Sequence, residues 1–287
     1  MKHGPLTRAA RRRAARRWPW LVAALLGAAS CTREASGDPA AVATADTTAV
    51  NPLRAVARAL VPRGAYRVVA VSRPGTIRGV VRPDHLPARH DATLAADDDD
   101  ASVCGTRVPD GSVYTDGHGL GNALVWVSDA RRGLAPPRPG RVALAVRRCQ
   151  VEPRVLALGA GTTIDFRSMD ATEHHTRFVN VLADSLLGHM LTVDRWAVVP
   201  SARIAAAPGL VEVEGAAHAF TRGYLAIFDN PYFAVTDRHG RFTIRGLPAG
   251  TYHLRVWHER GAAIVDSAVT VPAGKSVALD VELAIRE

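Results

Sequence analysis

The chain has 287 residues and a formal net charge of +9 at pH 7, from 36 basic and 27 acidic side chains. Seven of the basic residues lie within residues 1–31, which contain no acid, so the rest of the chain carries 29 basic and 27 acidic side chains. This near-neutral remainder offers no basic surface for a phosphate backbone, which excludes nucleic acid as a partner.

Residues 1–31 have the pattern of an export signal. A basic stretch precedes the short apolar run WPWLVAALLGAA, and small residues then suit a cleavage site. The run is shorter than the ~20 apolar residues of a membrane-spanning helix. The segment ending at Cys31 resembles the bacterial lipoprotein box, although Ala28 stands where that box usually has leucine. The resemblance implies a lipid on Cys31 that anchors an exported protein to a membrane of the periplasm or cell envelope; secretion as a soluble protein is the alternative.

Residues 32–65 predict a flexible tether followed by one short helix. Residues 32–50 are small and polar and show no hydrophobic period. Within NPLRAVARALVP, Pro52 fits the first turn of a helix and Pro62 ends it. The residues that share the apolar face of this helix are Leu53, Val56, Ala57 and Leu60.

From residue 66 onward the sequence predicts β-structure. Short runs rich in Val, Ile and Thr, such as YRVVAVS, NALVWVSD and SVALDVEL, are separated by Gly, Pro and Asp turns. No helical pattern is interleaved with them, which favours antiparallel β-sandwiches over βαβ units. The predicted fold class is therefore all-β, with one short N-terminal helix.

A run of four acids, Asp97–Asp100, lies between turn-like segments. Calcium binding in an EF-hand loop would need a glycine and an alternating spacing of oxygen ligands that this run lacks. We interpret the run as a solvated acidic loop.

Two cysteines remain once Cys31 is assigned to the signal, namely Cys104 and Cys149. An exported chain lies in an oxidising compartment, where an even pair of thiols most simply forms a disulfide. The sequence therefore predicts a Cys104–Cys149 bond.

The segment FAVTDRHGRFTIRGLPAGTYHLRVWHE contains two tight turns between alternating strands. Its residues from Thr236 to Tyr252 match the pattern T-D-x-x-G-x-F-x-I-x-x-L-P-x-G-x-Y. This pattern resembles the carboxypeptidase regulatory-like (transthyretin-like) β-sandwich. The resemblance implies a binding, spacing or stabilising domain without catalytic residues over residues 230–287.

A second resemblance extends from about Gly75 to Leu283. GTIRGVV, GLGNALVWV, the D-A-T-E-H of residues 170–174 and NPYFAVTD follow one another in this order. The order is similar to that of bacterial exported proteins described as cupredoxin-like, plastocyanin-like or methylamine-utilisation-like. It implies a cupredoxin-like β-sandwich over residues 66–229, which in that group often binds copper through two histidines, a cysteine and a methionine.

The copper motif of that group is incomplete in this chain. The resemblance places His174 and His218 at the two histidines, but Gly215 at the cysteine and Thr221 at the methionine. A blue-copper site depends on its copper–thiolate bond. We therefore expect a degenerate copper site, with His218 either a relic of that site or a structural hydrogen-bonding residue, and no metal or other cofactor.

The alternative hypothesis is an atypical histidine centre for copper or zinc, in a metal-binding or electron-transfer protein. Its ligands would be His174 and His218, with His175 as an alternate. Adjacent residues of a strand point to opposite faces, so His174 and His175 are not expected to share one metal ion.

No motif of an enzyme is present. The chain lacks G-x-S-x-G and P-loop patterns, and His258-Glu259 lacks the second histidine of the zinc-protease motif. Aromatic residues either form a sugar-stacking face or pack in the core, and their alternation along strands favours the core; these residues are Tyr224, Phe228, Tyr232 and Phe233. The expected function is a non-catalytic cell-envelope module that binds a glycan or a protein.

Overall fold

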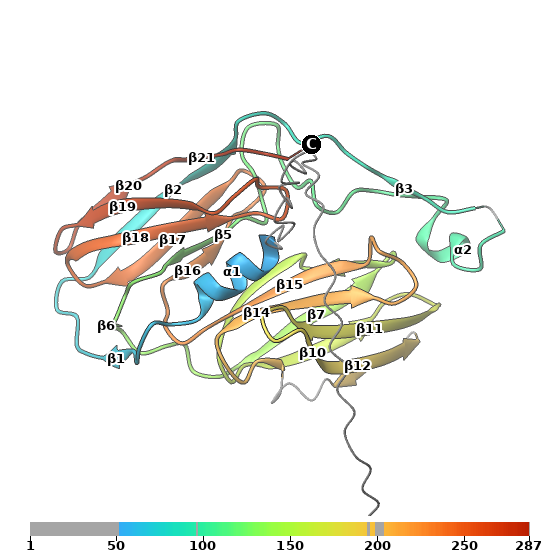
Figure 1. The fold of residues 1–287 in the computed structure, drawn as a ribbon, viewed down its shortest axis with the longest axis horizontal. Coiled ribbons are helices and arrows are strands. Elements are labelled where there is room, and N and C mark those ends of the chain that lie inside the picture. Colours follow the sequence, from blue (N-terminus) through green and yellow to red (C-terminus); the bar gives the residue numbers. More distant parts are fainter. Residues whose placement is uncertain (1–51, 96, 194–195, 199–203, 287) are drawn as a thin grey trace, which may run out of the picture. The chain divides into compact units, whose positions relative to one another are not determined.

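Strands form most of the regular structure in the computed structural model, which describes residues 52–286 except 96, 194–195 and 199–203 (Figure 1). The predicted export signal, the lipid site at Cys31 and the tether of residues 32–50 lie outside the described residues. No described helix has the length and apolar character needed to cross a membrane. The all-β prediction is confirmed.

One sandwich, here called the C-terminal sandwich, consists of two sheets around a single core. Its first sheet has the order β16 (Phe233–Val235), β5 (Leu124–Val127), β18 (Gly250–Trp257) and β19 (Val265–Val271). Its second sheet has the order β17 (Arg241–Leu247), β2 (Gly75–Pro83) and β20 (Ser276–Ala278), and β21 (Val281–Leu283) also pairs with β2. Alternate residues of both sheets, such as Ile77, Ile244 and Leu254, are buried between them.

A second sandwich, here called the middle sandwich, lies within residues 141–228. Its smaller sheet has the order β13 (Trp196–Val198), β10 (Thr163–Ser168), β7 (Arg141–Arg147) and β8 (Gln150–Glu152). Its larger sheet has the order β12 (Ser185–Val193), β11 (Glu173–Asn180), β14 (Gly209–Gly215), β15 (Arg222–Phe228) and β9 (Val155–Gly159). Phe166 and Phe178 meet edge to face in its core, with ring centroids 5.6 Å apart.

The strand pairing differs from the predicted division at residue 230. β2 and β5 belong to the range 66–229 that was assigned to the cupredoxin-like part, yet they pair with β17 and β18 of the C-terminal sandwich. The middle sandwich is therefore inserted between β5 and β16. The sheets are also mixed rather than purely antiparallel, because β7 pairs with β10 and β9 with β15 in parallel.

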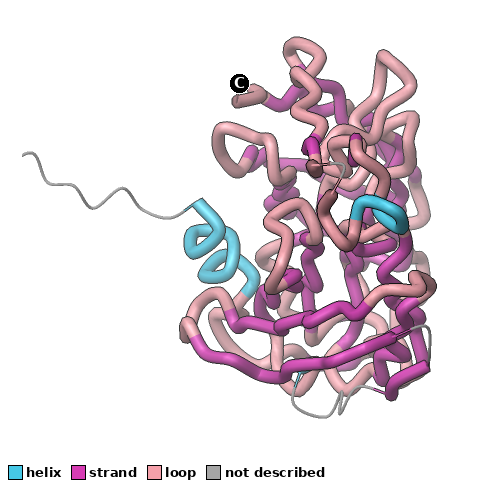
Figure 2. The backbone as a smooth tube through the Cα atoms, turned by 90° about the vertical axis from the view of Figure 1, so that its right-hand side faces the viewer, coloured by secondary structure: helices cyan, strands magenta, loops and turns pink. Residues whose placement is uncertain are grey.

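The predicted short helix is confirmed as α1 (Pro52–Leu60). It buries Val56, Ala57 and Leu60, as the apolar spacing predicts, in a cluster shared by both sandwiches that includes Trp126 and Trp257. The second helix, α2 (Ala101–Cys104), was not predicted. Figure 2 shows the two helices apart from each other beside the strands.

Two short strand pairs and the turns complete the described chain. β1 (Arg67–Val68) pairs with β6 (Arg132–Gly133), and β3 (Ala92–Thr93) pairs with β4 (Arg107–Val108). In the turn before β17, Gly240 has a φ of 72° and its Cα lies so close to Val81 that a Cβ would be 2.2 Å from the Val81 carbonyl oxygen. Only glycine fits this position of the regulatory-like motif.

The four aromatic residues considered for sugar stacking pack in the interior instead. Tyr224, Phe228 and Tyr232 are buried, and Phe233 is half-buried with its ring stacked on Phe228. The prediction that they serve the core is confirmed.

Candidate functional site

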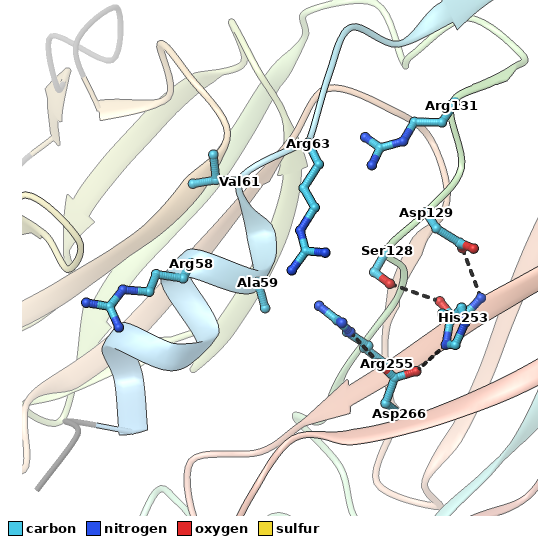
Figure 3. A pocket seen from close by; sticks show the side chains of 10 residues that line it. All are labelled: Arg58, Ala59, Val61, Arg63, Ser128, Asp129, Arg131, His253, Arg255 and Asp266. Carbon is cyan, nitrogen blue, oxygen red and sulfur yellow. Dashed lines mark hydrogen bonds and ion pairs between the residues drawn. The ribbon is translucent and has the colours of Figure 1, made fainter.

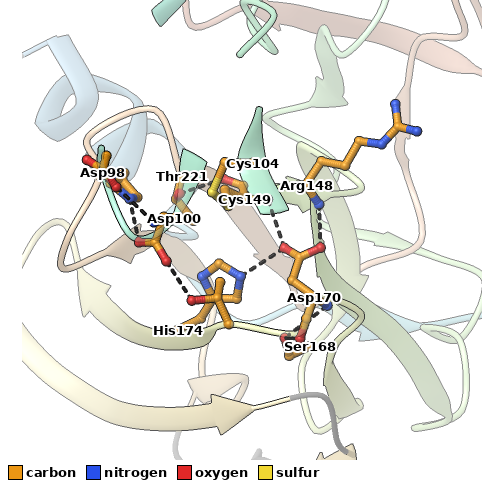
Figure 4. The surroundings of a disulfide bond; sticks show 11 residues. Asp98, Asp100, Cys104, Arg148, Cys149, Ser168, Asp170, His174 and Thr221 are labelled. Carbon is orange, nitrogen blue, oxygen red and sulfur yellow. Dashed lines mark hydrogen bonds and ion pairs between the residues drawn. A yellow bond between two sulfur atoms is a disulfide. The ribbon is translucent and has the colours of Figure 1, made fainter. Parts of the chain in front are cut away.

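The predicted disulfide is confirmed and lies at the centre of the candidate site (Figure 4). Cys104, at the end of α2, is bonded to Cys149, in the turn between β7 and β8, with Cα atoms 5.3 Å apart. The bond ties the segment between β2 and β5 to the middle sandwich. Both cysteines are buried, and because their sulfur atoms are joined in the disulfide, neither offers a thiolate to a metal ion.

A buried carboxylate holds His174 beside this disulfide. The Nε2 atom of His174, on β11, lies 2.8 Å from Oδ2 of Asp170. The Asp170 carboxylate also accepts hydrogen bonds from the backbone amides of Arg148 at 2.6 Å and Cys149 at 2.8 Å. Burial alone would raise the pKa of Asp170, but the hydrogen bonds from His174 and the two amides lower it below its usual range.

The same carboxylate therefore shapes the cysteine turn. Arg148 and Cys149 both have a positive φ, 48° and 60° respectively, which is uncommon for residues other than glycine. Hydrogen bonds from their amides to Asp170 stabilise this conformation. We infer that the Asp170–His174 pair has a structural task, which is to position Cys149 for its bond to Cys104.

His218 pairs with a different carboxylate. Its Nε2 atom lies 2.8 Å from Oδ2 of Asp100, and its ring stacks on Phe220 with centroids 4.8 Å apart. Oδ1 of Asp100 accepts a hydrogen bond of 2.5 Å from the hydroxyl group of Thr172. The bond from Thr172 lowers the pKa of Asp100, and His218 lowers it further against the opposing effect of burial.

The interpretation of the acidic run as a solvated loop is therefore wrong for Asp100. Its side chain is only 20 % exposed, and it occupies the N-cap position of α2 without making a cap hydrogen bond. The carboxylate turns instead towards the Thr172 hydroxyl and the His218 imidazole, which are its hydrogen-bond partners.

Gly215 and Thr221 fill the space that the resemblance assigns to the sulfur ligands. The Gly215 amide donates a 2.7 Å hydrogen bond to the Thr221 carbonyl, and the buried Thr221 hydroxyl donates one of 2.5 Å to the carbonyl of Cys149. A Cβ atom on Gly215 would lie 2.5 Å from the Cβ atom of Thr221, well inside van der Waals contact. A cysteine at position 215 does not fit this arrangement.

A blue-copper ion does not fit the described residues, because they offer neither a free thiolate nor two imidazoles in one group. Two groups of potential ligands have atoms within 4.8 Å of one another, and these are Cys149 with Asp170 and His174, and Asp98 with Asp100 and His218. The sulfur of the first group is oxidised in the disulfide, and each group contains a single imidazole. His175 lies apart from both groups, half-exposed, with Nε2 2.6 Å from Glu173 and its ring stacked on His189.

Substitution of Gly215 tests this packing. We expect Gly215→Ala to lower the free energy of unfolding by about 1–3 kcal/mol, because the added methyl group overlaps Thr221, which the Cys149 carbonyl holds in place. Urea denaturation measures the change. Gly188→Ala is the matched control, since its added methyl group would have no atom nearer than 3.5 Å. Equal stability of the two variants would contradict the assigned contact.

A second buried polar cluster lies where the two sandwiches meet. The guanidinium group of Arg154, between β8 and β9, makes two hydrogen bonds to the carboxylate of Glu259, at 2.8 and 2.7 Å. Both side chains are almost buried, with 11 % and 8 % of their surface exposed. The role of Arg154 could not be predicted from the sequence, because 105 residues separate it from its partner and no local motif joins them.

His258 lies beside this ion pair and is fully buried. Its Nδ1 atom accepts a 3.1 Å hydrogen bond from the backbone amide of Arg260. Burial lowers the pKa of His258 to about 4; Glu259 opposes this shift, while Arg154 and Arg260 reinforce it. The imidazole is therefore neutral in the folded protein at neutral pH.

This neutral histidine predicts a loss of stability in mild acid. An unfolded chain protonates His258 near pH 6.5, whereas the folded protein does so only near pH 4, so the free energy of unfolding falls as the pH drops between these values. We expect a loss of roughly 2 kcal/mol between about pH 7 and about pH 5. Urea denaturation over this range measures it, and a His258→Gln variant with an unchanged pH dependence would contradict the assignment.

Comparison with known proteins confirms the regulatory-like motif of the C-terminal sandwich. Residues 227–284 match the family model of the carboxypeptidase regulatory-like domain. Among solved structures, the chain is similar to a reduced amicyanin mutant, with 18 % identity over 30 % of this chain and 81 % of that chain and a TM-score of 0.26. It is also similar to a Cu(I) amicyanin mutant at pH 4, with 17 % identity over 37 % and 98 % of the two chains and a TM-score of 0.26. No curated protein matches the sequence.

The fold and the site together define a class. The described chain forms two β-sandwiches, and its His174 and His218 side chains are each paired with a carboxylate. Its C-terminal sandwich contains a carboxypeptidase regulatory-like domain.

Proposed function

We propose that this protein is a non-catalytic binding or accessory module of the cell envelope. It is exported, held at a membrane by a lipid on Cys31, and binds an envelope glycan or protein. The carboxypeptidase regulatory-like domain supports a binding or accessory role.

The contact between Gly215 and Thr221 carries the proposal. It occupies the positions where the resemblance would place both sulfur ligands of a copper ion, and it leaves no room for a cysteine side chain. His174 and His218 are hydrogen-bonded to separate carboxylates, so both imidazoles have structural partners. These observations favour a scaffold over a redox centre.

A metal-binding protein with an atypical centre is the second candidate. The ligand atoms of Asp98, Asp100 and His218 lie within 4.8 Å of one another, and carboxylate and imidazole groups are ligands that Zn²⁺ and Cu²⁺ accept. Binding would require His218 and Asp100 to exchange their mutual hydrogen bond for bonds to the ion. Metal titration of the wild-type protein and of His218→Ala separates this candidate from the scaffold.

The anchor is tested by substitution of Cys31. In cells that export the protein, we expect the wild type in the membrane fraction and Cys31→Ser in the soluble fraction of the envelope. Mass spectrometry of the mature N-terminus identifies the lipid directly. Wild-type protein that is found in the soluble fraction with an unmodified Cys31 would favour secretion as a soluble protein instead.

Partner binding is tested with the mature wild-type protein and isolated cell envelopes. We expect saturable binding that one of two treatments of the envelopes abolishes. Loss after protease treatment identifies a protein partner, and loss after polysaccharide-hydrolase treatment identifies a glycan partner. The same measurement is made with the Cys31→Ser variant. This variant has no anchor lipid, so its binding contains no contribution from insertion of that lipid into the membrane. Uptake that is linear in concentration and insensitive to both treatments would overturn the proposal.

A further inference from the structure

A pocket of about 290 Å³ lies between the end of α1 and the first sheet of the C-terminal sandwich (Figure 3). Its walls come from α1 and the segment that follows it, from the segment after β5, and from β18 and β19. The ionisable residues of the wall other than histidine are four arginines and two aspartates, so the wall has a formal charge of +2 with His253 neutral. They are Arg58, Arg63, Arg131, Arg255, Asp129 and Asp266.

The two aspartates are engaged within the wall itself. Asp266 accepts a 2.8 Å hydrogen bond from Nδ1 of His253 and one of 2.9 Å from Nε of Arg255. Asp129 accepts a 2.9 Å hydrogen bond from the backbone amide of His253. Neither carboxylate bonds to Arg63 or Arg131.

Two of the arginines, Arg63 and Arg131, have guanidinium groups with no acidic partner among the described residues. Among the residues that the structure describes, no hydrogen bond or ion pair joins the side chain of Arg63 or Arg131 to another residue. Figure 3 shows the guanidinium groups of Arg63 and Arg255 facing each other across the pocket, while Arg131 extends towards the same space. The unpaired charges of Arg63 and Arg131 repel each other in this space, and an anion bound between them would relieve the repulsion.

The shape and charge of this arrangement select the anion. A guanidinium group presents a planar fork of donors that matches the oxygens of a phosphate, and several forks offer more donors than the two oxygens of one carboxylate can accept. A phosphate monoester carries a charge of about −1.5 to −2 at neutral pH, which balances the +2 of the wall. The Ser128 hydroxyl lies in the same wall as a further polar group.

We propose that this pocket binds the phosphate group of a phosphate monoester, held by Arg63, Arg131 and Arg255. The group belongs to a soluble or glycan-borne ester or to a lipid headgroup. The inference goes beyond the proposed function, because it depends on these arginines alone and would stand if no envelope glycan or protein partner were found.

Calorimetric titration of the mature wild-type protein with inorganic phosphate and with glycerol phosphate tests the site. We expect saturable binding of both with a Kd of about 1 mM or lower. Arg63→Gln and Arg131→Gln should each weaken binding by about tenfold or more. Arg78→Gln is the matched control, since Arg78 is an exposed arginine on β2 outside the pocket, and it should leave the Kd unchanged.

Vesicles of phosphatidylcholine with and without phosphatidic acid identify the source of the group. A lipid headgroup in the pocket is supported if the protein binds both glycerol phosphate and the phosphatidic acid vesicles, and if Arg63→Gln and Arg131→Gln weaken both interactions. Binding of glycerol phosphate alone supports a soluble or glycan-borne ester. Absence of saturable phosphate binding, or an equal loss of affinity in Arg78→Gln and Arg63→Gln, would overturn the proposal.

Discussion

Replacement of both Cys104 and Cys149 by alanine is expected to lower the free energy of unfolding by about 4 kcal/mol. The disulfide closes a loop with a sequence separation of 45 residues, and the chain-entropy model assigns this cost to a loop of that length. The bond also lies in a small cluster of its own, with Leu94, Ala101 and Val108, which gives the segment around α2 little other support.

Denaturation with and without reductant provides the control for this prediction. Reductant should destabilise the wild type by about the same amount and leave the double-alanine variant unchanged. Two free thiols in the protein isolated under native conditions without reductant, detected by mass after alkylation, would contradict the account.

Removal of the carboxylate in Glu259→Ala is expected to cost about 3–5 kcal/mol of stability. The variant leaves the guanidinium group of Arg154 buried and without its anionic partner, which is far more costly than the loss of an exposed ion pair. In the wild type, burial lowers the pKa of Arg154, but the pairing with Glu259 outweighs this effect and raises the pKa above its usual value. Chemical denaturation monitored by tryptophan fluorescence measures the loss.

Two further variants make this second prediction specific. Glu152→Ala removes an exposed carboxylate that lies 3.8 Å from Arg147, and it should change stability by no more than about 1 kcal/mol. The double variant Arg154→Met, Glu259→Leu should recover most of the stability lost in Glu259→Ala, because no uncompensated charge stays buried. A loss below about 1 kcal/mol in Glu259→Ala would show that the pair is solvated in solution.

The elements that local pattern determines could be predicted from the sequence. The apolar spacing of α1 indicates which residues it buries, and Val56, Ala57 and Leu60 are buried. The Val-rich alternating runs predict strands, and the regulatory-like motif from Thr236 to Tyr252 predicts the turn in which Gly240 is required. The disulfide followed from the parity of the cysteines in a chain predicted to be exported.

Long-range pairings could not be predicted in the same way. The pairing of β2 with β17 joins residues far apart in the chain, and the alternation within β2 is equally compatible with either sandwich. The partner of His218 is Asp100, 118 residues away, within a run that resembles a solvated loop by composition. By contrast, Asp170 and His174 lie four residues apart inside the D-A-T-E-H motif, so their pairing could have been inferred from that spacing.

Copper analysis of the protein purified from the cells that produce it tests the central claim most directly, namely that His174 and His218 are structural residues rather than ligands. Metal content, the visible spectrum and electron paramagnetic resonance are measured before and after addition of Cu²⁺. The account predicts no stoichiometric copper and no intense blue absorption, because no thiolate is available at Gly215 or in the disulfide. A blue protein with one copper ion per chain, lost in His218→Ala, would contradict it.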